Sequence, residues 1–482
     1  MVILKSMFSM AALNMLKAIC SLLITFLVAK TVAPEAFGLV SFSVPLMAFI
    51  TILTDLGLVS SIVRHPVLSR GEAGAAVSLL LFAGALGGLI LTVGAPYAEE
   101  LFQLEGLAPV LMGFGLVTTL TIWAAPSRAL LEREYRYKEV AAVEVLALVT
   151  GLSACAVALL NAQGIMAIVA YQVAIQAVRA IAFLALSRGL HELNVSWRKL
   201  GSLASIGGWL LATNLLTYCA RNLDNILIGA FLGAKALGIY GLAYQFMTLP
   251  LVLFTWPVSG VLLSTLARLR HDENAKRNVI CAVITCTGAI TLPLMAALTF
   301  AAKIPLTLIY SDRWQGLELA VALLAPAGAF QSVAAFCGAV LIEKGAVRLN
   351  LILTVIICSS MVAVFFATVW FGLTTLMIGY MVVAIIASLV NLHFICVTAA
   401  ISHITILKSL SPGILAAGIA VGCTYLTVGL KPSDVYQWLE AVGVYGITVC
   451  AIWACFAPFI ARSLRALGRS GTDLKREDLI VG

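Results

Sequence analysis

The chain has 482 residues, of which 62% are hydrophobic and only 11% are charged. Soluble domains carry about 25% charged residues, so this composition, with a mean hydropathy of +1.07, excludes a water-exposed globular fold. The formal net charge of +8 raises nucleic acid binding as a question that the positions of the charges must answer.

Apolar stretches recur along the chain with the length of a membrane-spanning helix. The sequence therefore predicts an all-α polytopic membrane protein with about fourteen transmembrane helices of roughly 20 to 25 residues. The first helix has too long an apolar part for a signal peptide, and no small-residue cleavage site with a polar mature region follows it, so we expect it to be retained. In chain order the predicted helices cover residues 8–30, 38–62, 73–95, 107–128, 139–160, 163–187, 205–232, 238–266, 279–303, 317–341, 347–370, 373–398, 409–429 and 436–460.

The basic residues lie mainly on alternate connections between these helices. Of the 30 Lys and Arg residues, 22 fall on the side that holds the N-terminus, five on the opposite side and three inside helices. Cytoplasmic loops of membrane proteins are enriched in Lys and Arg, so we expect both termini to be cytoplasmic. The positive charge then follows from membrane topology, and no nucleic acid partner is predicted.

A sequence repeat relates the first and seventh predicted helices. Residues 14–50 align without a gap with residues 214–250, and seven of the 37 pairs are identical, including Asn14/Asn214 and Gly38/Gly238. Both copies carry a stripe of polar residues at helical spacing. Two such copies that start from the same side of the membrane predict a parallel repeat about an axis along the membrane normal.

The repeat predicts two six-helix lobes around a central cavity, plus two C-terminal helices. The N-terminal lobe is expected to cover residues 1–187 and the C-terminal lobe residues 205–398, with a cytoplasmic linker at 188–204 between them. Residues 399–460 then form helices 13 and 14, and residues 461–482 form a cytoplasmic tail.

Six charged residues are assigned to the interiors of the predicted helices, as distinct from their ends, and a charge there is costly unless it is paired or faces water. Lys17 and Asp55 lie at a similar depth on adjacent helices, as either a structural ion pair or a gate. Glu144 and Arg179 lie near the cytoplasmic ends of their helices, so they either snorkel to the interface or contribute to function. The remaining two are Arg221 and Asp224.

Arg221 and Asp224 lie near the centre of the seventh helix, on a face that also carries Asn214 and Asn225. Because lipid offers no hydrogen bonds, we expect this face to look into a hydrated cavity between the lobes. Arginine suits an anionic ligand there, since its planar fork donates two hydrogen bonds to a phosphate or carboxylate. The opposite wall is predicted to carry a polar row formed by Gln172, Gln176 and Arg179.

The cysteines, histidines and glycines of the sequence form no cofactor motif. The 11 cysteines and five histidines have no metal-ligand spacing, and no glycine-rich segment ends in GK[ST]. We therefore expect no metal, no cofactor and no ATP hydrolysis on this chain.

The segment RNLDNILIGAFLGAKALGIYGLAYQFMTLP (221–250) resembles the signature of bacterial polysaccharide transporters, the Wzx-type flippases of the multidrug/oligosaccharidyl-lipid/polysaccharide superfamily. Residues 60–76, 126–144 and 310–330 are similar to the same group. The resemblance implies an inner-membrane flippase, not an enzyme, that moves undecaprenyl-diphosphate-linked oligosaccharides by alternating access. Such a protein serves exopolysaccharide, capsule or lipopolysaccharide synthesis among membrane lipids, beside a polysaccharide polymerase and export machinery.

The resemblance also implies roles for the charged and polar residues. Lys17 and Arg221 match the cations that bind the diphosphate in such proteins, and the remaining substrate contacts are expected from Asn214, Asn225, Gln176 and Arg179. We expect gating or ion coupling, driven by a proton gradient, a sodium gradient or the membrane potential, to depend on Asp55, Asp224 and Glu144.

Two other functions stay open. A cation-coupled drug antiporter of the same superfamily would use Asp55 and Asp224 for a cationic substrate. A membrane polysaccharide polymerase or ligase is disfavoured, because the outward connections are short and carry neither a Ser-His-Asp arrangement nor paired carboxylates.

Overall fold

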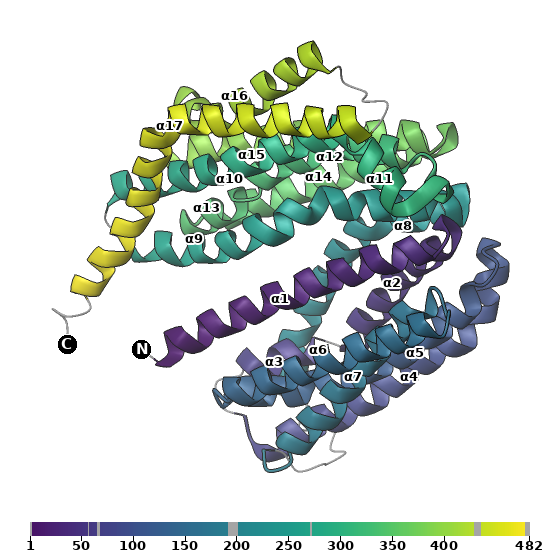
Figure 1. The fold of residues 1–482 in the computed structure, drawn as a ribbon. Coiled ribbons are helices and arrows are strands. Elements are labelled where there is room, and N and C mark those ends of the chain that lie inside the picture. Colours follow the sequence, from purple (N-terminus) through teal and green to yellow (C-terminus); the bar gives the residue numbers. More distant parts are fainter. Residues whose placement is uncertain are drawn as a thin grey trace. The chain divides into compact units, whose positions relative to one another are not determined.

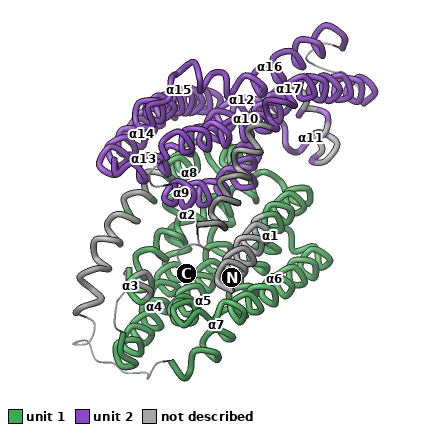
Figure 2. Tube along the Cα trace, turned by 90° about the vertical axis from the view of Figure 1, so that its left-hand side faces the viewer, with its two compact units in different colours: residues 1–241 green, residues 242–482 purple. Residues whose placement is uncertain are grey.

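The computed structural model describes residues 2–55, 57–64, 68–190, 201–269, 272–428 and 435–477. Within these ranges all regular secondary structure is helical and there is no strand (Figure 1). The predicted all-α class is therefore confirmed for the described part of the chain. The chain forms two compact units, residues 1–241 and 242–482 (Figure 2).

The first unit contains the N-terminal helices and most of the long helix α8. Its helices are α1 (Val2–Thr31), α2 (Pro34–Asp55), α3 (Leu58–Arg64), α4 (Arg70–Phe102), α5 (Leu107–Arg133), α6 (Tyr137–Leu160), α7 (Met166–Leu186) and α8 (Gly201–Pro250), the last of which continues into the second unit. The predicted lobe boundary at 188–204 lies largely in residues 191–200, outside the described residues, so the division into lobes stays a prediction.

The α4–α5 hairpin shows how the sequence shapes the first unit. Ser69 caps α4 by accepting a hydrogen bond from the Glu72 backbone at 3.2 Å, while the Glu72 carboxylate accepts one from the Ser69 backbone at 2.8 Å. This reciprocal capping box satisfies amides that have no partner inside the helix. Further along, the Trp123 indole donates to the Leu81 carbonyl at 2.8 Å and ties α5 to α4.

The second unit is built around α10, which packs against α12, α16 and α17. Buried polar contacts fasten these helices, as where the Tyr445 hydroxyl donates to the Pro293 carbonyl at 2.7 Å. Its helices are a π-helical turn (Leu251–Thr255), α9 (Trp256–Arg268), α10 (Glu273–Ala301), α11 (Lys303–Tyr310), a 3-10 turn (Ser311–Trp314), α12 (Leu317–Ala334), α13 (Cys337–Glu343), α14 (Val347–Thr368), a 3-10 turn (Val369–Phe371), α15 (Leu373–Ala399), α16 (His403–Thr427) and α17 (Val435–Glu477).

Twelve helices among the described residues are long and apolar enough to cross a bilayer, so the chain is a multi-pass membrane protein. One of these spans, Asn222–Arg268, has 47 residues. A straight helix of this length would be about 70 Å long at a rise of 1.5 Å per residue, more than twice the roughly 30 Å of a bilayer's hydrocarbon core. Its backbone is not helical at Gly233, where φ is 82° and ψ is 175°. The predicted number of fourteen spans stays a prediction.

Candidate functional site

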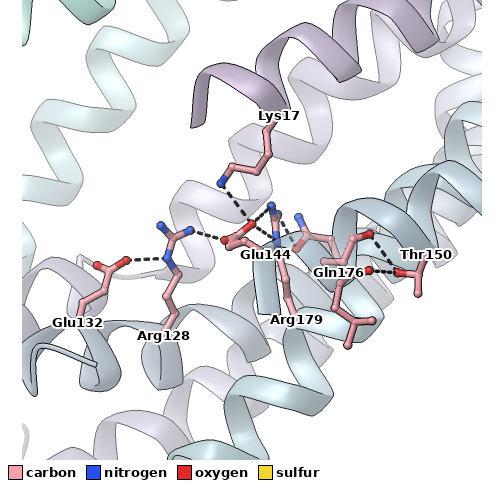
Figure 3. A network of polar contacts seen from close by, with 9 residues as sticks. Lys17, Arg128, Glu132, Glu144, Thr150, Gln176 and Arg179 are labelled. Carbon is pink, nitrogen blue, oxygen red and sulfur yellow. Dashed lines mark hydrogen bonds and ion pairs between the residues drawn. The ribbon is translucent and has the colours of Figure 1, made fainter. Parts of the chain in front are cut away.

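Glu144 on α6 is the centre of a cluster of charged side chains in the first unit (Figure 3). Its side chain is fully buried, at 0% exposure. One carboxylate oxygen, Oε2, accepts hydrogen bonds from Lys17 Nζ at 3.2 Å and from Arg179 Nη2 at 2.6 Å. The other, Oε1, accepts one from Arg128 Nη1 at 3.1 Å. One buried carboxylate thus binds three cations.

Four helices bring these side chains together. Lys17 lies on α1, which contacts both α6 and α7, and Arg128 lies on α5. The turn between α5 and α6 spans only residues 134–136, with Tyr135 at a φ of 57°. Because the two helices run antiparallel from this turn, Arg128 and Glu144 lie at the same level. The α6–α7 hairpin does the same for Glu144 and Arg179.

Two further polar side chains extend the cluster. The Arg179 guanidinium donates from Nε and Nη2 to one oxygen of Glu144, at 3.1 and 2.6 Å, and from Nη1 to Gln176 Oε1 at 3.3 Å. Arg128 donates from Nε to Glu132 Oε1 at 2.7 Å. The cluster is therefore a connected network that holds its cations in fixed orientations.

The charges of the cluster do not cancel. Three cations face two carboxylates, Glu144 and Glu132, which leaves one net positive charge. A charge in the interior of a membrane protein faces its neighbours or a water-filled space and marks a path for ions or substrate. An excess positive charge in this place attracts an anionic group.

Two cavities adjoin the cluster. The smaller, of about 150 Å³, is lined by Lys17, Ser21, Glu144, Tyr171, Gln172 and Arg179 among others. The larger, of about 440 Å³, lies between α5 and α7 and has Arg128, Glu132, Gln176 and Arg179 in its wall. Arg179 lies in the wall of both cavities, so a group bound in either cavity could contact its guanidinium.

The structure corrects two sequence interpretations. In the described residues Lys17 pairs with Glu144 rather than with Asp55, whose Oδ1 is buried at the end of α2 without a hydrogen-bond partner. Snorkelling of Glu144 and Arg179 is also wrong, because Glu144 is fully buried and holds Arg179 in an ion pair. Helical periodicity places a side chain on a face, but it does not say which helix lies opposite.

Asp224 and Asn225 lie on α8, away from this cluster. Asp224 is buried at 4% exposure, and it accepts hydrogen bonds from the Tyr240 hydroxyl at 2.7 Å and from the Asn225 backbone at 2.8 Å. The Tyr240 bond joins the two arms of α8 across the bend at Gly233. The side chains of Asn214 and Arg221 lie outside the described residues, so their predicted roles stay predictions.

Arg128 and Glu132 are the two charged members of the cluster that were not predicted as site residues. The helix predicted over residues 107–128 ends at Arg128, which places this residue among the basic residues of the following cytoplasmic connection, whereas α5 continues to Arg133. Glu132 lies four residues after Arg128, and this i,i+4 spacing of opposite charges is a weak indication in the sequence that the two side chains form an ion pair. Nothing in the sequence pattern indicates the contact with Glu144.

Comparison with known proteins adds the family context. The model of a family of polysaccharide biosynthesis proteins matches residues 27–318. The chain is 24% identical over 299 residues to the teichuronic acid biosynthesis protein TuaB of Bacillus subtilis (strain 168), covering 62% of each chain. It is 23% identical over 325 residues to the lipopolysaccharide biosynthesis protein WzxC of Escherichia coli (strain K12), covering 67% of this chain and 66% of that protein. Each match spans less than two thirds of the relative's length.

The fold is similar to a solved structure of the lipid II flippase MurJ in an inward closed conformation. The TM-score is 0.71 and the similarity covers 95% of this chain and 100% of that one, at 14% sequence identity. At this identity the likeness shows the fold alone.

Proposed function

We propose a transport function for this chain, which belongs to the polysaccharide biosynthesis protein family. It moves a lipid-linked oligosaccharide, joined to undecaprenol through a diphosphate, from the cytoplasmic to the periplasmic leaflet of the bacterial inner membrane. The delivered units serve exopolysaccharide, capsule or lipopolysaccharide synthesis. TuaB is named for teichuronic acid biosynthesis and WzxC for lipopolysaccharide biosynthesis, and these names support a polysaccharide precursor as the substrate.

The observation that carries the proposal is the excess positive charge around Glu144. A diphosphate diester has two negative charges and several acceptor oxygens, and both arginines of the cluster have planar forks that suit such oxygens. Lys17, Arg128 and Arg179 therefore bind the diphosphate, and Gln176 adds an amide in the same wall. Glu144 organises the cations by holding them around one point.

The two cavities divide the headgroup between them. The diphosphate lies at the smaller cavity beside Lys17 and Arg179. The first sugar lies in the larger cavity, where Gln176 and Glu132 offer partners for hydroxyl groups. The undecaprenyl chain stays in the lipid, and no covalent bond of the substrate changes during transport.

The remaining predicted residues have roles in the transport cycle. Alternating access requires that the site opens to one side of the membrane at a time. Arg221, Asn214 and Asn225 on α8 receive the headgroup as it leaves the Glu144 cluster. Asp55 and Asp224 gate the path or bind the coupling ion, and the energy comes from a proton gradient, a sodium gradient or the membrane potential.

Partners and orientation follow from the same reasoning. The basic connections lie in the cytoplasm, so both termini are cytoplasmic. Newly delivered units pass to a polysaccharide polymerase and export machinery on the periplasmic side.

A cation-coupled drug antiporter is the second candidate. The acidic residues Asp55 and Asp224 favour it, whereas the excess positive charge around Glu144 opposes it, because a cationic substrate would be repelled there. Efflux of a lipophilic cation dye, stimulated by an ion gradient and lost in Asp224→Asn, would support the antiporter.

The test is a transport assay on the purified protein in liposomes. A fluorescent short-sugar undecaprenyl diphosphate is placed in both leaflets, and a membrane-impermeant quencher reports how fast the inner-leaflet pool reaches the outside. Wild-type protein is expected to accelerate exchange over empty liposomes, and Arg179→Ala is expected to lose the acceleration. Equal exchange with wild-type protein and with empty liposomes would overturn the proposal.

A further inference from the structure

Two turns between helices meet within the first unit. One is the connection from α1 to α2 with the start of α2, and the other is the bend of α8 at Gly233. Here the backbones touch. A methyl group added to Gly38 would lie 2.7 Å from the Ala234 carbonyl carbon, and one added to Gly238 would lie 2.7 Å from the Pro34 carbonyl carbon. Non-bonded carbon atoms ordinarily stand about 3.5 to 4.0 Å apart, so only glycine permits this approach at either position.

The two pairs of residues in this contact are related by an offset of 200 positions in the sequence. Gly38 meets Ala234, and the residues 200 positions away from these two, Gly238 and Pro34, also meet. Contacts of this reciprocal kind are those of a two-fold interface, where residue i meets j and j meets i. The shift is the same as the offset of the sequence repeat between residues 14–50 and 214–250.

Two more pairs lie along the same line. Glu35 Oε1 is 3.7 Å from Lys235 Nζ, with both side chains more than half exposed. A carbon added to Gly241 would lie 3.2 Å from the Ser41 Cβ. The members of each pair are again 200 residues apart. The contact therefore includes the exposed ion pair Glu35–Lys235 and the close packing of Ser41 against Gly241.

The contact lies far from the ion cluster. Lys17 and Thr31 are on the same helix, 14 residues apart, which is about 21 Å at 1.5 Å per residue. Thr31 adjoins the turn that holds Pro34, and the Glu144 cluster lies at the depth of Lys17. On the predicted topology the turn faces the periplasm.

We infer that residues 34–41 and 233–241 form the periplasmic gate of the transport path, closed in this structure by backbone contact across a local two-fold axis. The inference rests on the proposed function. No backbone hydrogen bond of either helix has to break when the two turns part. An exposed ion pair such as Glu35–Lys235 adds little stability, so the gate separates readily when the headgroup reaches it.

A disulfide across the contact tests the gate. Ser41→Cys and Gly241→Cys are introduced into a chain whose 11 native cysteines are replaced by serine. The 3.2 Å separation of the two carbons is near the Cβ spacing of disulfides, about 3.5 to 4.5 Å. The matched control is Gly113→Cys with Val169→Cys, where the carbons are 3.6 Å apart and join α5 to α7.

We expect the oxidised 41–241 pair to lose transport and reduction to restore it, while the oxidised 113–169 control transports as its reduced form does. Full transport by the oxidised 41–241 pair would overturn the gate, because the contact would then be a fixed joint. Failure of the two cysteines to form a disulfide would also overturn it, since the closed contact would not occur.

A second readout separates the gate from the proposed substrate. Ser21 lines the smaller cavity, so a cysteine at Ser21 reports access from the periplasmic face to a membrane-impermeant maleimide. Labelling of the cysteine at position 21, distinguished by mass spectrometry from labelling at positions 41 and 241, is expected in the reduced 41–241 variant and not in the oxidised one. This result with no lipid transport in the wild type would keep the gate and reject the substrate, whereas equal labelling in both forms would reject the gate.

Discussion

Lys17 and Glu144 form a salt bridge of 3.2 Å although 127 residues separate them in the chain. The bridge holds α1 on α6 and places the Lys17 ammonium beside the guanidinium of Arg179, which binds the same carboxylate oxygen. Two cations on one oxygen leave donor groups that an incoming anion can use. The proposed substrate site of the first unit is therefore an organised set of cations and not a set of separate ion pairs.

Replacing Arg179 is expected to slow transport by about 10- to 100-fold, since hydrogen bonds to charged groups contribute roughly 1.5 to 3 kcal/mol. Arg179→Ala removes the fork and the charge, whereas Arg179→Lys keeps the charge and is expected to retain part of the rate. The initial rate in liposomes measures both. Arg313→Ala, which removes an exposed cation in the second unit, is the control, and an equal loss there would argue against a local role.

Glu144→Gln is expected to destabilise the protein. Removal of one partner from a buried ion pair costs about 3 to 5 kcal/mol, and here three cations would lose their common partner. The melting temperature of each variant, measured by thermal unfolding in detergent, checks this. Glu139 lies on the same helix as Glu144, and Glu139→Gln breaks its partly exposed pair with Arg136, which is expected to cost at most about 1 kcal/mol. Equal melting temperatures for both variants would contradict the structural role of Glu144.

Asp224→Asn separates the charge of this residue from its shape. The asparagine oxygen can still accept the hydrogen bond that Tyr240 donates at 2.7 Å, so the bend of α8 is expected to persist and the melting temperature to change little. If Asp224 binds the coupling ion, transport by the variant no longer responds to an imposed proton or sodium gradient. An unchanged response would remove Asp224 from the coupling mechanism.

Gly38→Ala is expected to hold the proposed gate open. The added methyl group would overlap the Ala234 carbonyl, so periplasmic labelling of a cysteine at Ser21 should rise while transport falls. The control is Gly94→Ala on α4, where nothing lies within 4 Å of the added carbon. Labelling that stays at the wild-type level in Gly38→Ala would contradict this prediction.

The fold class and the membrane location follow from the sequence because they depend on composition and on helix length. Long apolar runs with few charges have few structural alternatives in a bilayer. The helix ends were harder to predict, as at α5, where basic residues near the interface such as Arg128 are compatible with either a loop or a last helical turn.

The candidate site was predicted only in part. Lys17, Glu144, Gln176 and Arg179 were singled out because charged and polar residues are unusual in apolar segments, and the structure brings all four together. Their pairing could not be predicted, since it depends on which helices are neighbours. Lys17 is four predicted helices away from Glu144 in the chain, and the adjacent helix offered Asp55 as a plausible but wrong partner.

The most direct test of the transport proposal is made in cells that lack this gene and whose polysaccharide polymerase is blocked. Lipid-linked sugar units are quantified in each leaflet of the inner membrane, with wild-type protein, with Arg179→Ala or with no protein supplied. We predict accumulation in the cytoplasmic leaflet without the protein, reversal by the wild type and little reversal by Arg179→Ala at equal protein level. Normal arrival of the units at the periplasmic leaflet without the protein would contradict the proposed function.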